Sequence, residues 1–320
     1  MKVLLPLHVV LATALLPFAW AEPSLDELLK SGRADEAIRA LNAEIQTNRN
    51  DALAYNRLSR VYFQLEQWDT AMHIAEKAVA LEPRNSLYHQ WLGRAEGRKA
   101  EVSNPFTAFG LARKVKAEFE RSVALDGNNI SARADLAEYY WEAPGFLGGD
   151  RNKARLQAEA IAHYDPALAA YITARVEEKQ GSGHAEEQFQ KAITAAGGDS
   201  ARYWVELAHY YNRAARPLDL ELAVNRSLTA AHHGGLPEYD GAFLLFDAGR
   251  NFPAAIKMLR SYLAGDNSAE DGPAFHAHYL LGRLLEKQGD HLSAAEEYRA
   301  ALALASQFRP AKGALARVSR

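Results

Sequence analysis

Histidines and carboxylates are the residues of this 320-residue chain that could do acid–base or metal chemistry, but their spacing favours neither. His276 and His278 are two positions apart, which on a helix puts the imidazoles on different sides and makes a poor chelating pair. His232 and His233 precede two glycines and are interpreted as an exposed helix end, and His209 is isolated. The chain has no Cys, which excludes disulfides, thiolate zinc sites, iron–sulfur clusters and Cys nucleophiles.

Motifs for nucleotide, zinc-protease and serine-hydrolase chemistry do not occur in the sequence. The stretch that begins at Asp126 faintly resembles a calcium loop, but it lacks the required Gly and has Ala137 where the bidentate Glu belongs. Carboxylates such as Glu186 and Glu187 are scattered over polar stretches, where solvation is the default. We therefore predict a non-catalytic protein without a cofactor or a metal ion.

Composition indicates a helical protein that does not bind nucleic acid. The 37 Lys and Arg residues nearly balance the 40 Asp and Glu residues, for a net charge of −3, so strong attraction to a polyanion is not expected. Ala accounts for 60 residues and Pro for 12. Because Ala has the highest helix propensity, this composition favours an all-α fold.

The first 21 residues have the features of a secretion signal. Lys2 supplies a positive start, residues 3–18 are largely apolar, and Ala19-Trp20-Ala21 has the small-x-small pattern that signal peptidase reads. We expect cleavage before Glu22 and a periplasmic or secreted protein of residues 22–320; an uncleaved anchor is the alternative. No later apolar run reaches the ~18 residues of a membrane span, so we expect no stable membrane insertion of the mature chain.

A 34-residue pattern recurs along the rest of the chain. Counted from Ala52, aromatic residues fall at positions 4 and 11, Leu at 7, Ser at 8, Ala at 20 and 27, and Pro at 32. This pattern resembles that of the tetratricopeptide repeat family, whose units are pairs of antiparallel helices. Small residues at 8, 20 and 27 let the two helices approach closely, and Pro at 32 ends the second helix.

The resemblance covers nearly all of residues 23–318. It implies an all-α, right-handed superhelical solenoid of about eight helix pairs, with a closing helix at 308–318. A pair can bury its apolar face only against its neighbours, so we expect one domain over 22–320 with a continuous core. The phased aromatic residues, such as Trp68 and Trp204, are interpreted as packing residues.

Two departures from the period are informative. Unit three is ten residues too long, and Asn104 followed by Pro105 is typical of a helix start, which predicts an extended helix pair at about 87–125 that protrudes from one edge. Unit four is five residues too long because of a Gly- and Pro-rich loop at 143–150, after which Asp150 is expected to cap the next helix.

Both insertions are expected at the same edge of the solenoid. We hypothesise that Phe146 and Leu147 fold onto the extended pair near Phe106 and Phe109. Such a contact could reinforce the edge or form a dedicated partner site, and the sequence leaves both readings open.

The resemblance also implies a binding surface, because in this family the first helix of each pair lines a concave groove. The residues at the matching positions are Asn56, Arg60, Phe63, Gln90, Arg94, Arg98, Trp141, Tyr171, Arg175, Lys179, His209, Arg213, Tyr279 and Arg283. Arg recurs at the ninth position of four units, and guanidinium groups pair with carboxylates and stack on rings, which favours an extended or acidic peptide. The alternative is that these arginines pair with Glu of neighbouring helices.

We therefore predict a scaffold or adaptor of the periplasm or cell exterior that binds a protein or peptide partner through the groove or the extended pair. The family's carboxylate clamp for chaperone tails is not supported, because Asn56 and Arg60 stand where it has Lys and Asn. A homo-oligomer is compatible with the sequence. A small-ligand or glycan-binding envelope protein, or an enzyme with an unrecognised site, is the alternative.

Overall fold

The computed structural model describes residues 23–197, 200–230, 235–265 and 271–319. The expected signal peptide at 1–21 and the pair His232–His233 lie outside these residues. The described part of the chain forms seventeen α-helices and one short 3-10 helix, and no strand. These elements are α1 (Leu25–Lys30), α2 (Ala34–Thr47), α3 (Ala52–Gln64), α4 (Trp68–Leu81), α5 (Ser86–Glu101), α6 (Pro105–Leu125), α7 (Ile130–Glu142), η1 (Gly145–Leu147), α8 (Arg151–Ile161), α9 (Pro166–Gln180), α10 (Ala185–Ala195), α11 (Ala201–Arg213), α12 (Pro217–Thr229), α13 (Leu236–Asp247), α14 (Phe252–Ala264), α15 (Ala274–Lys287), α16 (His291–Leu304) and α17 (Arg309–Val318).

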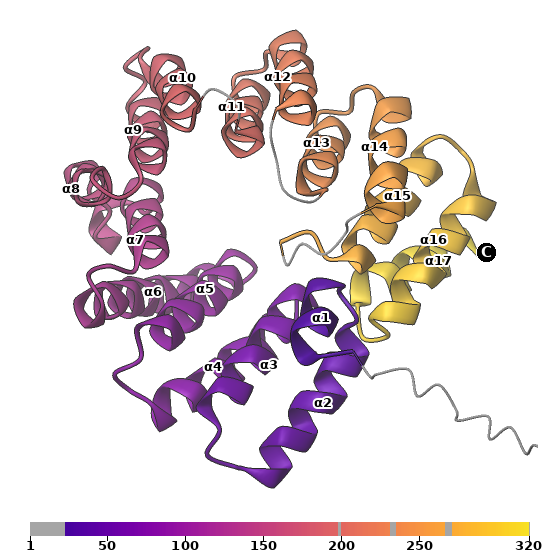
Figure 1. Cartoon of the computed structure of the whole chain (residues 1–320), viewed down its shortest axis with the longest axis horizontal. Coiled ribbons are helices and arrows are strands. Elements are labelled where there is room, and N and C mark those ends of the chain that lie inside the picture. Colours follow the sequence, from indigo (N-terminus) through magenta and orange to yellow (C-terminus); the bar gives the residue numbers. More distant parts are fainter. Residues whose placement is uncertain (1–22, 198–199, 231–234, 266–270, 320) are drawn as a thin grey trace, which may run out of the picture.

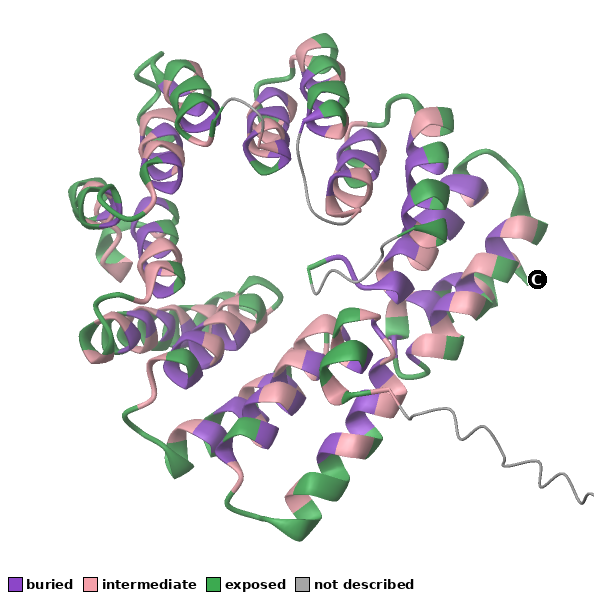
Figure 2. Ribbon diagram, viewed as in Figure 1, coloured by how far each residue is buried: buried purple, intermediate pink, exposed green. Residues whose placement is uncertain are grey.

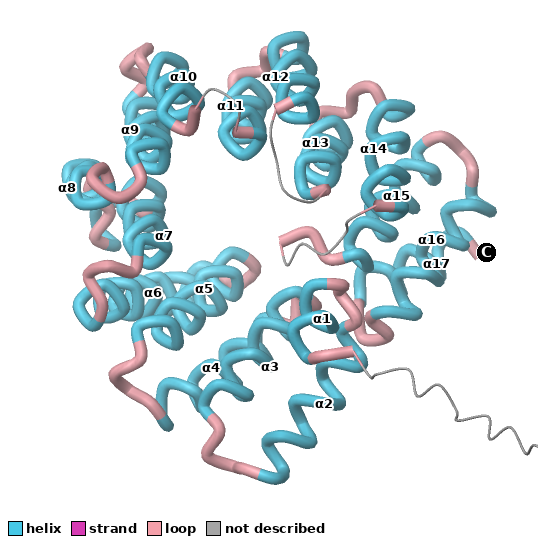
Figure 3. The backbone as a smooth tube through the Cα atoms, in the orientation of Figure 1, coloured by secondary structure: helices cyan, strands magenta, loops and turns pink. Residues whose placement is uncertain are grey.

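Helices α1 to α16 form eight consecutive pairs, and α17 follows them. The predicted all-α solenoid of about eight units with a closing helix is therefore confirmed. In Figure 3, α7, α11 and α13 lie on the inner side of the arrangement and α8, α12 and α14 on the outer side. No helix in the described residues is long and apolar enough to cross a membrane.

Small residues allow the helices of a pair to approach closely, as the repeat pattern predicts. Ala71 and Ala78 in α4 are completely buried. At Gly93 in α5, a Cβ atom would lie 2.6 Å from a ring carbon of Phe119 in α6. Gly is therefore required at this position by the space that the Phe119 ring occupies.

Replacing Gly93 by Ala should lower the free energy of unfolding by about 1–3 kcal/mol, because the added methyl group forces the Phe119 ring to move. The matched control is Gly97→Ala in the same helix, where the nearest side-chain atom, on Val115, would be 3.9 Å away. There the higher helix propensity of Ala should raise stability by about 0.5–1 kcal/mol. Urea denaturation of both variants tests this; effects of the same sign would contradict it.

Six α-helices in the described part of the chain end in the same kind of turn, in which one residue has a left-handed backbone. These residues are Gly32, Glu66, Gly181, Ala215, Gly249 and Gly289. In each turn the next residue donates its N–H to a carbonyl five positions before it, as Gln67 does to Tyr62 at 3.0 Å. Four of the six are Gly, which has no Cβ to strain this conformation, whereas Glu66 (φ 57°) and Ala215 (φ 53°) adopt it with a side chain.

The solenoid closes on itself, so that its first and last helices meet (Figure 1). Leu28, Ile38 and Leu41 of α1 and α2 share one buried apolar cluster with Phe275 of α15 and with Phe308, which precedes α17. Buried residues therefore lie between neighbouring helices around the whole ring, including this junction (Figure 2). We call the junction between α1–α4 and α15–α17 the seam.

Hydrogen bonds also cross the seam. The Nε2–H of His276 donates to the backbone oxygen of Gln64 at 2.7 Å, and the N–H of Ser306 donates to Oδ2 of Asp35 at 2.9 Å. Burial lowers the pKa of His276 to about 4, so its imidazole is neutral at pH 7 and can donate from only one nitrogen. The repeat pattern does not predict this closure, because it specifies contacts between neighbouring units only.

The extended pair forms as expected. Helix α6 spans Pro105–Leu125, and the side chain of Asn104 accepts hydrogen bonds from the N–H groups of Phe106 and Thr107. The loop at 143–150 contains η1, and Asp150 caps α8. The last turn of α5 places Arg98 in a pocket with residues of α13 and α15. The extended end of the α5–α6 pair therefore points toward the middle of the ring (Figure 1). The prediction that this pair protrudes from one edge of the solenoid is wrong in this respect.

The hypothesis about the loop is confirmed in one contact and wrong in another. The ring of Phe146 stacks on that of Phe109 with 6.4 Å between centroids and 10° between planes. The hydroxyl of Tyr139 donates to the backbone oxygen of Leu147 at 2.7 Å and holds η1 in place. Phe106 is not covered, because it is 93% exposed.

Candidate functional site

The two histidines singled out by their spacing contact different partners. His276 donates to Gln64 across the seam, and Nδ1 of His278 lies 2.6 Å from Oε2 of Glu297 in α16. No group of three or more His, Asp or Glu side chains in the described residues could hold a metal ion.

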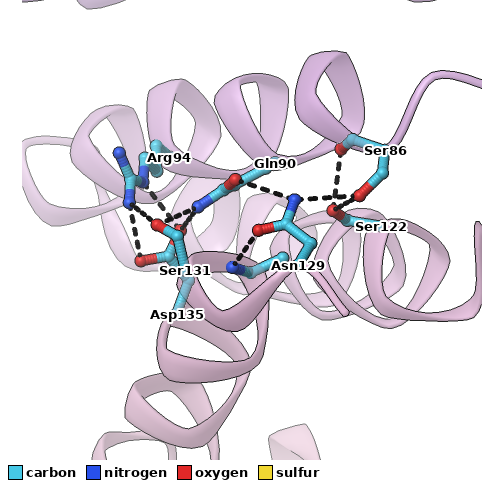
Figure 4. A network of polar contacts seen from close by, with 8 residues as sticks. Ser86, Gln90, Arg94, Ser122, Asn129, Ser131 and Asp135 are labelled. Atoms are coloured by element: carbon cyan, nitrogen blue, oxygen red, sulfur yellow. Dashed lines mark hydrogen bonds and ion pairs between the residues drawn. The ribbon is translucent and has the colours of Figure 1, made fainter. Parts of the chain in front are cut away.

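Gln90 and Arg94 belong to a polar network between α5 and α7 (Figure 4). The guanidinium group of Arg94 donates to both carboxylate oxygens of Asp135, at 2.7 and 3.1 Å. The amide of Gln90 donates to Ser131 at 2.8 Å and to Asp135 at 2.7 Å. These two predicted groove residues therefore connect successive repeats.

The cations on the inner side of α9 and α11 are also paired. Arg175 is buried and bridges Glu142 and Glu178, at 3.0 and 2.5 Å. Lys179 contacts Glu142 at 2.6 Å, and Arg213 contacts Glu178 at 2.7 Å. These cations therefore pair with Glu residues of this chain, which was the alternative to peptide binding by the groove arginines.

Several predicted groove residues do not face a groove. Asn56 is completely buried, and Gln90 and Trp141 are buried as well, because neighbouring repeats pack over them. The ring of Tyr171 packs edge-on against Trp141, and the guanidinium group of Arg283 donates to the hydroxyl of Tyr279 at 3.1 Å and lies over the ring of Phe246. The buried members of this set present no surface, whereas Tyr171, Tyr279 and Arg283 are partly exposed and are held by contacts within the array.

Carboxylates on the inner side of the ring are a feature that the sequence analysis missed. Glu138 is exposed, but the surrounding residues of the ring partly desolvate its carboxylate, and this desolvation and the charge of Asp135 raise its pKa to about 7. Burial and the charge of Glu206 raise the pKa of Asp240 to about 7. His209 is held neutral, because burial and Arg213 lower its pKa to about 4. No local pattern marks these groups, since their proximity depends on the ring.

A pocket of about 300 Å³ opens at the seam, and we call it the seam pocket. The wall from α3, α4 and α5 presents Arg60, Phe63, Gln64, Glu66, Trp68, Trp91 and Arg98. The opposite wall, from α13, the residues before α15, and α15, presents Tyr239, Asp271, Pro273 and His276. The seam pocket therefore exists only where the two ends of the array meet, and among the predicted groove residues it gathers Arg60, Phe63 and Arg98.

Rings and guanidinium groups build the first wall. Phe63 packs edge-on against Trp68 and Trp91, with centroids 5.1 and 5.8 Å apart. The guanidinium group of Arg60 lies 4.8 Å from the Trp91 ring centroid, and that of Arg98 lies 5.2 Å from the Trp68 centroid. Such stacking fixes flexible cationic side chains in place, and Nη1 of Arg98 also donates to Oε2 of Glu101.

A second candidate surface is formed by the two insertions. Phe106, Phe109 and Phe146 are 93%, 45% and 78% exposed, and we call these three residues the apolar tip. Phe106 and Phe109 are three positions apart in α6 and share a face of the helix, and Phe146 stacks on Phe109. Large apolar side chains brought together at a surface mark an interaction site.

Comparison with known proteins agrees with this architecture. Residues 28–95 and 239–307 each match a family model described as tetratricopeptide repeat. The fold is similar to that of yeast Tom70, with 14% identity over 93% of this chain and a TM-score of 0.55; the match spans 64% of the Tom70 chain. A tetratricopeptide repeat protein from Parabacteroides merdae matches at 11% identity over 92% of this chain and 99% of its own, with a TM-score of 0.45. MamA matches at 20% identity over 55% of this chain and 96% of its own, with a TM-score of 0.43.

Proposed function

Because this chain is a tetratricopeptide repeat protein, we propose that it is a non-catalytic scaffold that binds a partner protein at the apolar tip. Proteins built from these repeats generally bind other proteins. The observation that carries the proposal is the exposure of Phe106, Phe109 and Phe146 at one place, created by the two insertions that depart from the repeat period.

Burial of these rings supplies the binding energy. Phe is enriched at the centres of protein interfaces, and each apolar Å² removed from water contributes about 25 cal/mol. The concave arginine row offers less, because Arg94, Arg175 and Arg213 already bind carboxylates of this chain. A partner would have to displace those pairs.

The charge around the apolar tip selects the partner. Arg113 is exposed and lies one turn of α6 beyond Phe109, on the same face, and Lys114 next to it is exposed as well. We therefore propose a partner surface with apolar side chains flanked by Asp or Glu. Such steering charges make association salt-dependent.

We also propose that the protein acts in the periplasm or at the cell exterior. The support is the sequence of residues 1–21, with its positive start, apolar run and Ala19-Trp20-Ala21 cleavage pattern. N-terminal sequencing of the protein from native cells tests this, and a mature chain that begins at Glu22 is expected.

The double variant Phe106→Ser and Phe146→Ser should bind the partner at least tenfold more weakly, which corresponds to about 1.4 kcal/mol or more. Stability should change by less than about 0.5 kcal/mol, because both side chains are exposed. The measurement is crosslinking and capture from the native envelope, followed by affinity measurement with the purified partner at low and high salt.

The matched control is Leu292→Ser in α16, which removes an apolar side chain that is 85% exposed and lies away from the insertions. It should bind the partner normally. Equal capture by the wild-type protein, the control and the double variant would overturn the apolar tip as the binding surface. Absence of any specific partner would overturn the scaffold.

A further inference from the structure

A second cavity lies beside the apolar tip, and we call it the loop pocket. It has a volume of about 520 Å³ and is lined by the end of α7, the loop at 143–150, the start of α8 and the end of α9. This volume is within the range of ~300–1,000 Å³ that is common for ligand pockets. Gly145 lines the loop pocket, and the next residue, Phe146, belongs to the apolar tip. A molecule that covers Phe146 therefore has the loop pocket next to it.

The loop at 143–150 is held in place by short contacts with the end of α7. The N–H of Asp150 donates to the backbone oxygen of Tyr140 at 2.9 Å. Gly149 packs so closely against Ala143 that a Cβ atom would lie 1.7 Å from the backbone oxygen of Ala143. These contacts fix the shape of the loop pocket before anything binds, which lowers the entropic cost of binding.

The carboxylates at the loop pocket are already bound within this chain. Glu142 accepts hydrogen bonds from two cations, Arg175 at 3.0 Å and Lys179 at 2.6 Å. Asp150 accepts hydrogen bonds from two N–H groups in the first turn of α8, at 2.9 and 3.3 Å. The negative charge of Glu142 is therefore offset by two side chains, and that of Asp150 by the positive end of a helix.

Several hydrogen-bond donors at the loop pocket, in contrast, are open. Arg151 is exposed, and its guanidinium group makes no hydrogen bond or ion pair with the described residues. Arg155 donates to Oδ1 of Asn152 at 3.5 Å and to Oε1 of Gln180 at 2.6 Å. Because the amide oxygens face Arg155, the two amide nitrogens are directed away from it, and neither has an acceptor in the described part of the chain.

The loop pocket therefore matches a ligand with a negative charge and acceptor oxygens. A guanidinium group pairs with a carboxylate through two parallel hydrogen bonds, and amide N–H groups can donate to the same ligand. A partner protein is the favoured source of this carboxylate, because the loop pocket is continuous with the apolar tip, whose partner is expected to carry Asp or Glu beside its apolar side chains.

We propose that the loop pocket binds an Asp or Glu side chain of the partner that covers the apolar tip, with Arg151 as the group that pairs with the carboxylate. Asn152 and Gln180 donate hydrogen bonds to the same part of the partner. This inference rests on the proposed function and adds that the partner reaches over the loop at 143–150. The partner is then selected at two points, by its apolar side chains at Phe146 and by its charge at Arg151, which increases specificity.

The first test is an NMR titration of the purified protein with acetyl-L-aspartic acid α-amide, a blocked aspartate that represents an Asp side chain within a chain. We expect it to shift the Nε–H signal of Arg151 and the side-chain amide signals of Asn152 and Gln180, with a Kd below about 50 mM. Acetyl-L-asparagine amide, which has no charge, should bind at least tenfold more weakly. Acetyl-glycylglycine, which represents a chain end, and inorganic phosphate should bind no more tightly than the blocked aspartate.

The second test uses a pair of arginine variants. Arg151→Gln should bind the blocked aspartate and the captured partner at least fivefold more weakly, and its partner binding should depend less on salt. The matched control is Arg226→Gln in α12, which removes an exposed arginine that has no ion pair among the described residues. This control should bind both as the wild type does. Both variants should keep the Tm of the wild type, because both side chains are exposed.

Three results would overturn the proposal: no shift of the Arg151 signal up to about 100 mM blocked aspartate, tighter binding of phosphate or acetyl-glycylglycine, or unchanged partner affinity in Arg151→Gln. If Arg151→Gln binds the partner normally and the double variant Phe106→Ser and Phe146→Ser does not, the apolar tip is the binding surface and the loop pocket is not part of it. If no partner is captured, the proposed function fails together with the partner as the source of the carboxylate, whereas the titration reports on the loop pocket alone.

Discussion

Replacing Phe308 by Ala should lower the free energy of unfolding by about 3–5 kcal/mol and open the ring. Phe308 has no exposed surface and packs against Phe275, His276 and Tyr279, with ring centroids 4.8–5.4 Å apart. It also belongs to the apolar cluster that contains Leu28 and Leu41 from the other end of the array. Urea denaturation measures the loss, and small-angle X-ray scattering measures the shape.

The matched control is Phe189→Ala. Phe189 of α10 is equally buried, and the rings that it contacts, Tyr171 of α9 and Tyr210 of α11, lie away from the seam. We expect a similar loss of stability in this variant with no change in the maximum dimension of the folded protein. An unchanged maximum dimension in the Phe308 variant, under conditions where it remains folded, would show that the seam does not depend on this side chain.

The second large effect is expected at Glu96, a carboxylate of α5 that is only 2% exposed. Its Oε2 has no hydrogen-bond partner among the described residues, and the nearest cation, Nζ of Lys114, is 3.9 Å away. The carboxylate of Glu118, which binds His89 at 2.5 Å, is also close. Burial and the charge of Glu118 raise the pKa of Glu96 to about 8.

The direction of the pH effect follows from this raised pKa. Between the unfolded value of 4.5 and about 8, the folded protein binds the proton more tightly than the unfolded chain does. The contribution of protonated Glu96 to the free energy of unfolding is therefore fully present below about pH 4.5 and is lost as the pH rises to about 8. At 1.36 kcal/mol per pKa unit, the loss is on the order of 3–5 kcal/mol.

Glu96→Gln should remove this pH dependence, because a neutral amide replaces the carboxyl group at nearly the same shape. The variant should match the wild type near pH 5 and be more stable by a few kcal/mol at pH 9 in urea denaturation.

Other groups with shifted pKa values, such as His276 and Asp240, are present in both proteins, so their effects cancel when the two stabilities are subtracted. Glu159→Gln, at an exposed carboxylate of α8, is the control and should show no such difference. If the free energy of unfolding of the wild type does not fall relative to that of Glu96→Gln between pH 5 and 9, Glu96 does not have a raised pKa in the folded protein.

Features governed by local physics were predictable from the sequence. Asn104 and Pro105 determine where α6 starts, because capping and the fixed φ of Pro act within one turn, and the predicted range of 105–125 matches the helix. The close approach at Gly93 follows from the repeat register in the same way. The N-cap of α8 at Asp150 was predictable for the same reason, because capping acts within one turn.

Features that depend on distant parts of the chain were not predictable. Phe275 and Phe308 look like ordinary repeat residues, and nothing near them in the sequence indicates that they contact α1 and α2. The groove positions were assigned from an open array, so the burial of Asn56 was missed, and the pairing of Arg175 was predicted only as the alternative. The left-handed backbone of Glu66 is likewise a structural finding, because that position is usually filled by Gly.

The hydrogen bond from Ser306 to Asp35 joins residues that are 271 positions apart, whereas the contacts inside a repeat array are short in sequence. Short-range contacts form early and can nucleate anywhere, and a contact of this span must wait until the chain between its ends is ordered. The seam, and the pocket within it, is therefore the last part of the molecule to be assembled. A chain that emerges from the ribosome therefore has its helices before it has this pocket, and only a finished ring presents it.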